Sequence, residues 1–321
     1  MKIVTSLIRV CGGTLTALLC LAWSSTNAAE GPAFGGPVGG SDIGAAYLPG
    51  ASGFYGAAVA GYAHGDHFYG DNGKRADDTA IQNKSGVVAA GLLYVYPVKW
   101  LGGTLGTTVQ GSLSTGNIHL NGVSQKYDGT GDLYSDLLIW SRYLGSADVA
   151  HGAPPTGLTV RVAYSMLFGT GRYDKNAIVS TGRNVTYLIP NFALTYLTGP
   201  NWLGDGTEFS ANFYWDIATK NRATGYLNGP VFDVDLAVSE RIGKWQIGVA
   251  GYYATQMSGD QRDGLPIPGG NKFGSAAIGP VIAYTIPEWK SSVKFKLQLP
   301  LYARNSMTQT VGYLVFSKAF N

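Results

Sequence analysis

Charged residues are scarce in this sequence, and their scarcity excludes several classes of protein. Asp, Glu, Lys and Arg make up 13% of the 321 residues, against about a quarter in an average protein. A disordered chain would be charge-rich and aromatic-poor, whereas 12% of this chain is aromatic. The formal net charge is only +3, so we expect no nucleic-acid partner bound through a basic surface.

Cysteine is almost absent, and the two cysteines present lie in a segment that we expect to be removed. Residues 1–28 combine a positively charged start, a short apolar stretch and small residues at the end, which is the pattern of a secretory signal peptide. Cleavage is expected after Ala28, with Ala29 as the alternative. The leucines before Cys20 argue against lipid attachment there. Without Cys11 and Cys20, the exported chain has no disulfide scaffold, cysteine metal site or thiol catalysis.

Long apolar runs are also missing. No stretch of 18 or more apolar residues follows the N-terminal segment, so a helical membrane protein is excluded. Instead the chain has 46 glycines, 20 tyrosines and an ordinary 45% of hydrophobic residues. These numbers favour a Gly- and Tyr-rich β protein, part of whose surface faces something other than water.

The hydrophobic pattern has the period of two expected for strands whose side chains alternate between two faces. In residues 231–242 the apolar face holds Phe232, Val234, Leu236 and Val238, opposite Asp233, Asp235, Ala237, Ser239 and Arg241. Twelve segments of this kind are expected, at residues 54–67, 86–98, 104–117, 132–143, 158–168, 185–197, 207–219, 230–242, 245–256, 273–286, 291–304 and 308–320.

The connections between these segments alternate in length and charge. Long polar loops are expected at residues 66–84, 117–131, 169–184, 220–229 and 258–272, with residues 304–307 as a short exception. The intervening connections are mostly shorter, and four tryptophans lie beside them: Trp100, Trp202, Trp245 and Trp289. Alternating loops and turns with an aromatic girdle are typical of an outer-membrane barrel. A soluble β-sandwich also alternates, but it does not require an apolar face on every strand.

We therefore predict an all-β fold, a transmembrane antiparallel β-barrel of about 12 strands spanning residues 54–321. Residues 29–53 are rich in Gly and Pro and should be irregular. This segment is either a plug inside the lumen or a flexible periplasmic lead. The last strand ends in Phe320, but Lys318 interrupts its apolar face, so the sequence leaves the facing of this strand open.

Strand parity also selects candidate residues for the barrel lumen and the path of a solute. The charged candidates are Asp136, Arg142, Arg161, Asp216, Asp233, Asp235, Arg241, Lys294, Lys296 and Arg304. Asp216, Asp233 and Asp235 come from neighbouring strands and should form one acidic patch. Lys294 and Lys296 should lie across the lumen from this patch. Such an arrangement either orients polar groups of a solute or holds the interior together by mutual pairing.

Aromatic residues share the polar parity on several strands. They are Tyr134, Trp140, Tyr214, Tyr252 and Tyr302. Tyrosine and tryptophan have an apolar body with a hydrogen-bonding tip, so a lumen lined by them suits hydrophobic or aromatic solutes. The alternative is that they only fill a narrow barrel.

No motif points to catalysis, a cofactor or a metal. His64 and His67 are three residues apart, so on a strand they face opposite sides. Ser114 and His119 are also of opposite parity and do not form a nucleophile–base pair. We expect no enzyme activity, no catalytic residues, no cofactor and no metal.

A series of short motifs resembles one protein family. They are Tyr47-Leu48-Pro49-Gly50, Gly53-Phe54-Tyr55-Gly56, Thr170-Gly171-Arg172-Tyr173-Asp174, Thr224-Gly225-Tyr226-Leu227-Asn228-Gly229, Phe232-Asp233-Val234-Asp235-Leu236-Ala237, Gly248-Val249-Ala250-Gly251-Tyr252-Tyr253 and Ile278-Gly279-Pro280. In this order they resemble the outer-membrane proteins assigned to the MetA (meta-cleavage) pathway of phenol degradation.

The resemblance implies an outer-membrane channel or transporter of a Gram-negative bacterium. The expected function is passive uptake of small hydrophobic or aromatic compounds. The expected partners are outer-membrane lipids, the solute and the outer-membrane assembly machinery. The alternative is a non-transporting barrel with a structural or surface-interaction role.

Overall fold

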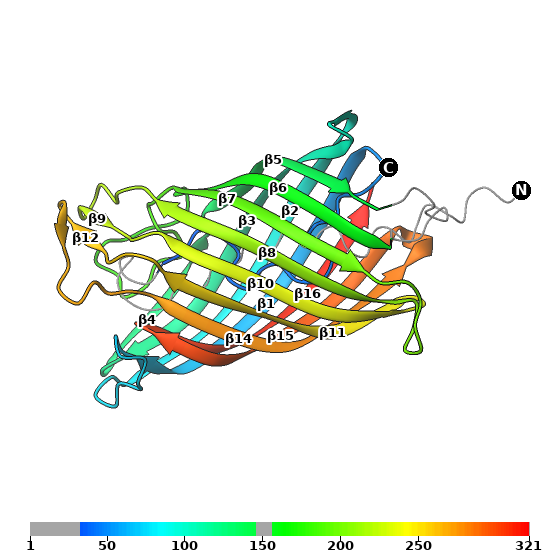
Figure 1. The fold of residues 1–321 in the computed structure, drawn as a ribbon. Coiled ribbons are helices and arrows are strands. Elements are labelled where there is room, and N and C mark those ends of the chain that lie inside the picture. The colour runs from blue at the N-terminus through cyan, green and yellow to red at the C-terminus, as the bar shows by residue number, and fades with distance from the viewer. Residues whose placement is uncertain (1–32, 146–155, 321) are drawn as a thin grey trace, which may run out of the picture.

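A computed structural model of the chain describes residues 33–145 and 156–320, and the predicted signal peptide lies outside these ranges. Twelve antiparallel strands close into a barrel (Figure 1), because β1 (Gly53–Tyr69) pairs with β2 (Ile81–Trp100) on one side and with β16 (Ser306–Ala319) on the other. The predicted all-β barrel of about 12 strands is confirmed.

The remaining wall strands follow in chain order around the barrel. They are β3 (Gly103–Leu120), β4 (Val123–Thr130) with β5 (Leu133–Tyr143), β6 (Gly157–Phe168), β7 (Tyr187–Leu197), β8 (Gly206–Ala218), β10 (Val231–Ile242), β11 (Trp245–Gln256), β14 (Gly274–Ile286) and β15 (Ser291–Arg304). Strands β4 and β5 share one position, since β3 pairs with β4 over Leu113–Leu120 and with β5 over Thr104–Gln110.

The two ends of the barrel differ. At one end, which we name the loop end, lie the β6–β7, β8–β10 and β11–β14 connections. The strands β9 (Tyr226–Leu227), β12 (Gln261–Arg262) and β13 (Leu265–Pro266) form a small sheet there, on the left in Figure 1. At the opposite turn end, β10 and β11 are joined by two residues, and β14 and β15 by the 3-10 helix η3 (Pro287–Trp289) and Lys290. Within the described part of the chain, no helix is long and apolar enough to cross a membrane.

One predicted loop is instead a hairpin. Residues 117–131 were expected to form a long polar loop, but β3 and β4 continue through most of this range and meet at Asn121-Gly122. Both turn residues have positive φ, 47° and 87°, which a two-residue type I′ turn requires and which Asn-Gly readily adopts. Asn121-Gly122 is a typical hairpin sequence, but the polar residues on both sides of it led to the prediction of a loop.

The outer face of the wall is apolar. Along β10 the outward side chains Leu236 and Val238 are about half exposed, and Phe209 and Ile217 on β8 are exposed to a similar degree. Leu314 and Phe316 of β16, and Phe320 directly after it, point outward. Lys318 shares this outward parity near the end of the strand, so the last strand follows the common alternation.

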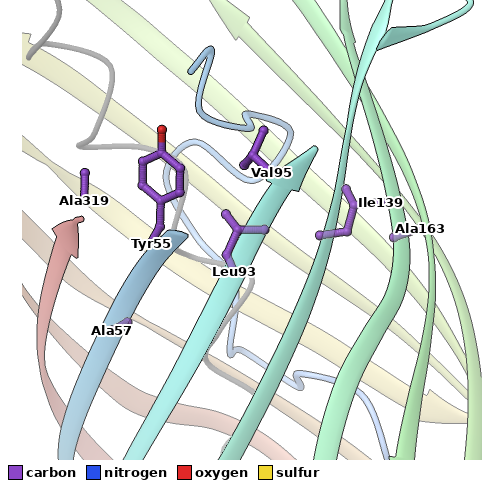
Figure 2. Close-up of a cluster of buried hydrophobic side chains, with 7 residues drawn as sticks. All are labelled: Tyr55, Ala57, Leu93, Val95, Ile139, Ala163 and Ala319. Carbon is purple, nitrogen blue, oxygen red and sulfur yellow. The ribbon is translucent and has the colours of Figure 1, made fainter. Parts of the chain in front are cut away.

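The interior near the turn end contains a small apolar cluster. It comprises Tyr55, Ala57, Leu93, Val95, Ile139, Ala163 and Ala319 (Figure 2). These side chains come from β1, β2, β5, β6 and β16, and Leu48, which precedes β1, packs against them. Tyr55 also donates a hydrogen bond from its hydroxyl to the Ala51 carbonyl over 2.7 Å, so the start of β1 is fixed to the chain before it.

The apolar outer face makes a prediction about folding into lipid. Leu236→Arg should lower the free energy of unfolding in lipid vesicles by about 2–4 kcal/mol, because it places a charge on the lipid face of a strand. Leu203→Arg, in the exposed β7–β8 turn, is the matched control and should change it little. Denaturant titration in vesicles measures both, and equal values for the two variants would contradict a lipid-facing β10.

Candidate solute pathway in the barrel interior

We name residues 33–52 the N-terminal segment, and residues 33–49 of it lie in the barrel interior. Nearly all of residues 33–49 are buried. The segment contacts wall residues near the loop end first, through Asp216 of β8, and wall residues near the turn end last, through Thr195 of β7. The segment therefore follows the long axis of the barrel before the chain enters β1.

Wall carboxylates accept hydrogen bonds from the backbone of this segment. Gly35 and Gly36 donate to one oxygen of Asp216 over 2.9 and 2.8 Å. Gly39 and Ser41 donate to Asp235 of β10 over 2.6 and 2.7 Å, and Gly44 donates to Glu208 of β8 over 2.6 Å. Buried backbone N–H groups require acceptors, and a segment without strand pairing takes them from these side chains.

Two wall lysines bind the opposite side of the segment. Lys294 and Lys296 of β15 contact Asp42 at 2.6 and 3.0 Å. Lys296 also donates to the carbonyl of Gly39 over 2.5 Å, and Gln298 donates to the same oxygen over 2.7 Å. Removing one partner of a buried ion pair is strongly destabilising, because it leaves an uncompensated charge.

Other predicted charges pair within the wall. Arg161 of β6 lies 3.4 Å from Asp136 of β5, and both are buried. Asp136 also accepts hydrogen bonds from Thr108, Tyr134 and Ser165.

At the turn end, Arg241 pairs with Glu208. Its guanidinium also lies 5.9 Å from the ring centre of Tyr47 in the N-terminal segment. Arg241 of β10 therefore interacts with both the wall, through Glu208, and the segment, through Tyr47.

Asp233 differs from its neighbours. It is fully buried, and neither carboxylate oxygen has a hydrogen-bond partner among the described residues. Tyr214 and Tyr252 also face inward, and the hydroxyl of Tyr252 lies 3.0 Å from that of Ser275. The structure thus brings the predicted aspartates of β8 and β10 to one side of the interior and the lysines of β15 to another, with Asp42 reaching the lysines.

Four predicted lumen residues face outward, and β-bulges explain them. The β5–β6 register shifts between Asp136 and Leu138, so Trp140 and Arg142 leave the face that Asp136 occupies. The nitrogen of the Trp140 ring and a guanidinium nitrogen of Arg142 donate to the exposed carbonyls of Trp100 and Leu101. An inserted residue reverses the facing of every residue after it.

The same reversal occurs on β15. Its pairing with β14 shifts between Ala276 and Ala277, which leaves Leu301 unpaired. Tyr302 is consequently exposed, and Arg304 donates to the Lys272 carbonyl at the loop end instead of entering the lumen. Assignment of Tyr302 and Arg304 to the lumen is therefore wrong.

Several interior residues were not selected from the sequence. Glu208 has the same parity as Tyr214 and Asp216, so the alternation on its strand contained it. Asp42 stands in an irregular segment, where no period indicates facing. Arg183 and Phe34 lie outside the strands and are buried together at the loop end, with the guanidinium 5.9 Å from the ring centre.

At the loop end, a polar cluster surrounds Asp260 in the β11–β14 loop. Tyr226, Gln256 and the backbone of Gly229 donate to its carboxylate over 2.6, 2.7 and 2.9 Å. Burial raises the pKa of Asp260, and these hydrogen bonds oppose the rise. The cluster fixes the loop next to Phe273, whose backbone N–H donates to Gln256 over 3.1 Å.

A cavity of about 50 Å³ remains between the N-terminal segment and the wall. Phe34 and Val38 line it from the segment, and Tyr252, Met307 and Tyr313 are among the wall residues around it. One water needs about 10–15 Å³ by this kind of measure, so the cavity holds a few waters and is too small for an aromatic ring.

The close approach of Gly35 makes a prediction about the segment. A Cβ at Gly35 would lie 2.4 Å from the Cβ of Tyr187, so Gly35→Ala should weaken the docking of the segment by about 1–3 kcal/mol. We expect faster cleavage of the segment by added protease. Gly50→Ala is the matched control, because a Cβ there meets nothing within 4 Å. Equal cleavage rates in the two variants would show that the tight fit at Gly35 does not hold the segment.

Comparison with known proteins relates this fold to outer-membrane barrels. The COG4313 outer membrane channel from Pseudomonas putida F1 has a TM-score of 0.66 and 14% identity, over 85% of this chain and 97% of that chain. The beta domain of the Bordetella autotransporter Brka has a TM-score of 0.49 and 10% identity, over 84% and 100%. The transport unit of the autotransporter AIDA-I from Escherichia coli has a TM-score of 0.46 and 11% identity, over 83% and 90%.

Sequence comparison gives the family. No protein with a curated description matches the chain. A family model described as "Putative MetA-pathway of phenol degradation" matches residues 41–314, a range that includes the end of the N-terminal segment and nearly all of the barrel. The chain belongs to this family.

Proposed function

We propose that this protein is an outer-membrane channel for passive uptake of small hydrophobic or aromatic compounds, and that the N-terminal segment is its plug. The apolar outer face and the barrel fold support a place in the outer membrane. The similar structure from Pseudomonas putida F1 is that of an outer membrane channel, and the family description names phenol degradation; both are consistent with this role.

The observation that carries the proposal is how the interior is filled. A single segment lies along the barrel axis and is held by hydrogen bonds and ion pairs to Asp216, Asp235, Lys294 and Lys296. Each hydrogen bond to one of these charged groups contributes only about 1.5–3 kcal/mol net, because water can replace the partner. A segment held in this way can leave its wall contacts without an energy source, which a permanent core would not allow.

In the open state the wall groups would line the path. The inward residues Tyr134, Tyr214 and Tyr252 present aromatic bodies with hydroxyl tips, and Asp136 and Arg161 remain paired with each other. A paired wall has little net charge at that level, so it does not select strongly for ions. This combination suits neutral solutes with a ring and one or two polar groups.

A barrel that stays closed is the second candidate. The ion pairs of Asp42 with Lys294 and Lys296 favour it, because Asp42 cannot leave the wall without separating its buried charge from those of both lysines. In that case the interior contacts are structural, and the function lies in the surface loops.

Deletion of residues 33–50 separates the two candidates. If the segment is the plug, the purified variant should conduct in planar bilayers far more often than the full chain and should admit phenol into proteoliposomes faster. Gly50→Ala in the full chain should behave as the unchanged protein and controls for handling of the sample. If neither protein conducts and neither speeds entry of phenol, the transport proposal fails and the closed barrel is favoured.

A further inference from the structure

Phe34 occupies a pocket at the loop end whose walls come from other parts of the chain. Its ring stacks on that of Phe273, with ring centres 5.6 Å apart and planes 30° apart. Val231 of β10 and Ala254 of β11 complete the apolar cluster. Only 6% of Phe34 is exposed. An aromatic ring, supplied by the plug itself, thus fills a site built by the barrel.

Hydrogen-bonding groups without partners lie around Phe34 and the two glycines that follow it. Arg183 is 5% exposed, and its Nη1 lies 3.4 Å from Asp132. Among the described residues, its Nε and Nη2 have no hydrogen-bond partner, and neither have the hydroxyl of Tyr187 and the Oδ1 of Asp216. Buried polar groups without partners are rare in native structures. Here Arg183 lies beside the ring of Phe34, and Tyr187 and the Oδ1 of Asp216 lie against the two glycines that follow Phe34.

We propose that Phe34 holds the place of a substrate, and that an aromatic solute with a neutral hydroxyl group binds by displacing its ring. This inference rests on the proposed channel function and names the solute class and its first site. The ring of the solute contacts Phe273 and the guanidinium of Arg183. Its hydroxyl accepts a hydrogen bond from Arg183 and donates one to the free oxygen of Asp216, since a hydroxyl does both.

The surrounding charges select a hydroxyl over a carboxylate. Asp132, Asp216 and Asp260 lie close enough to Tyr187 to act electrostatically on its hydroxyl, and so does the cation Arg183. Arg183 already pairs with Asp132. A carboxylate on the solute would face excess negative charge, which costs binding energy, whereas a neutral phenol would not.

The available space makes displacement necessary. The neighbouring cavity of about 50 Å³ is well below the roughly 150 Å³ that binds benzene in an engineered protein cavity. A second ring therefore enters only if Phe34 leaves. Gly35 and Gly36 follow Phe34 directly and donate hydrogen bonds to Asp216, so movement of Phe34 also weakens these hydrogen bonds. Solute binding at the loop end is thereby coupled to loosening of the plug.

Calorimetric titration of phenol into the purified full chain tests this site. Phe34→Ala removes the internal competitor and should tighten phenol binding by about tenfold, if Phe34 occupies the site about nine-tenths of the time. Phe34→Leu, which keeps apolar bulk without a ring, should give a smaller gain in the same direction. Phe316→Ala, on the outer face, is the matched control and should leave phenol affinity unchanged.

Chemical selectivity gives an independent readout. In the Phe34→Ala protein, phenol should bind at least about tenfold tighter than benzoate or toluene. Adding Arg183→Lys should remove the preference for phenol over toluene, because lysine lacks the planar donor edge of arginine.

Unchanged phenol affinity in both Phe34 variants would overturn the proposal, and so would tighter binding of benzoate than of phenol. If the plug deletion conducts while phenol binding ignores Phe34, this site fails and the channel stands. If phenol binding depends on Phe34 but the plug deletion does not conduct, the channel proposal fails and the binding site stands.

Discussion

The structure depends on mutual satisfaction of polar groups inside the barrel. The N-terminal segment forms no strand pairs, so its amides must find acceptors, and the wall supplies Asp216, Asp235 and Glu208. Those carboxylates are buried and would be costly to leave without donors. The amides of the segment therefore provide donors for the wall carboxylates, which in turn are acceptors for the amides. Asp42 of the segment likewise provides the negative charge that Lys294 and Lys296 of the wall require. The position of the segment, the closure of the lumen and the placement of Phe34 all follow from this exchange.

The same constraint explains why the composition is unusual. An apolar outer face for lipid leaves few surface positions for charge, so the charged residues concentrate in the loops and the interior. Several interior charges are paired, as Arg161 is with Asp136 and Arg241 with Glu208, and others accept hydrogen bonds from the backbone of the segment. Among the described residues, the Asp233 carboxylate, the Tyr187 hydroxyl and two nitrogens of Arg183 have no hydrogen-bond partner, and they lie along the solute route proposed above.

Much of the fold could be predicted from the sequence, because each strand of a barrel carries its own alternation of apolar and polar side chains. That alternation correctly gave the inward facing of Asp216, Asp235, Lys294 and Lys296. It failed where local geometry interrupts the period. The bulges after Asp136 and at Leu301 reverse Trp140, Arg142, Tyr302 and Arg304. No residue type in β5 indicates its bulge, but Pro300 beside Leu301 was a signal for the second one, because proline inside a strand is found mainly at edges and bulges.

The contacts of the segment could not be predicted at all, since they join residues up to 259 positions apart, as between Gln298 and Gly39. An irregular segment has no period to indicate its facing, so Asp42 and Phe34 carried no signal of their role. The long separation also means that nothing local fixes the segment. Its position depends on the completed barrel, and the proposed opening depends on how readily it leaves.

A reversible tether between the segment and the wall tests the central claim most directly. Ala46 and Ala193 belong to one buried cluster that joins the segment to β7, and both cysteines of the chain lie in the predicted signal peptide. The measurement is bilayer conductance of the Ala46→Cys, Ala193→Cys double variant before and after reduction. The account predicts a silent channel when the disulfide is closed and openings after reduction. Equal conductance in the two states would contradict a plug that must leave the lumen.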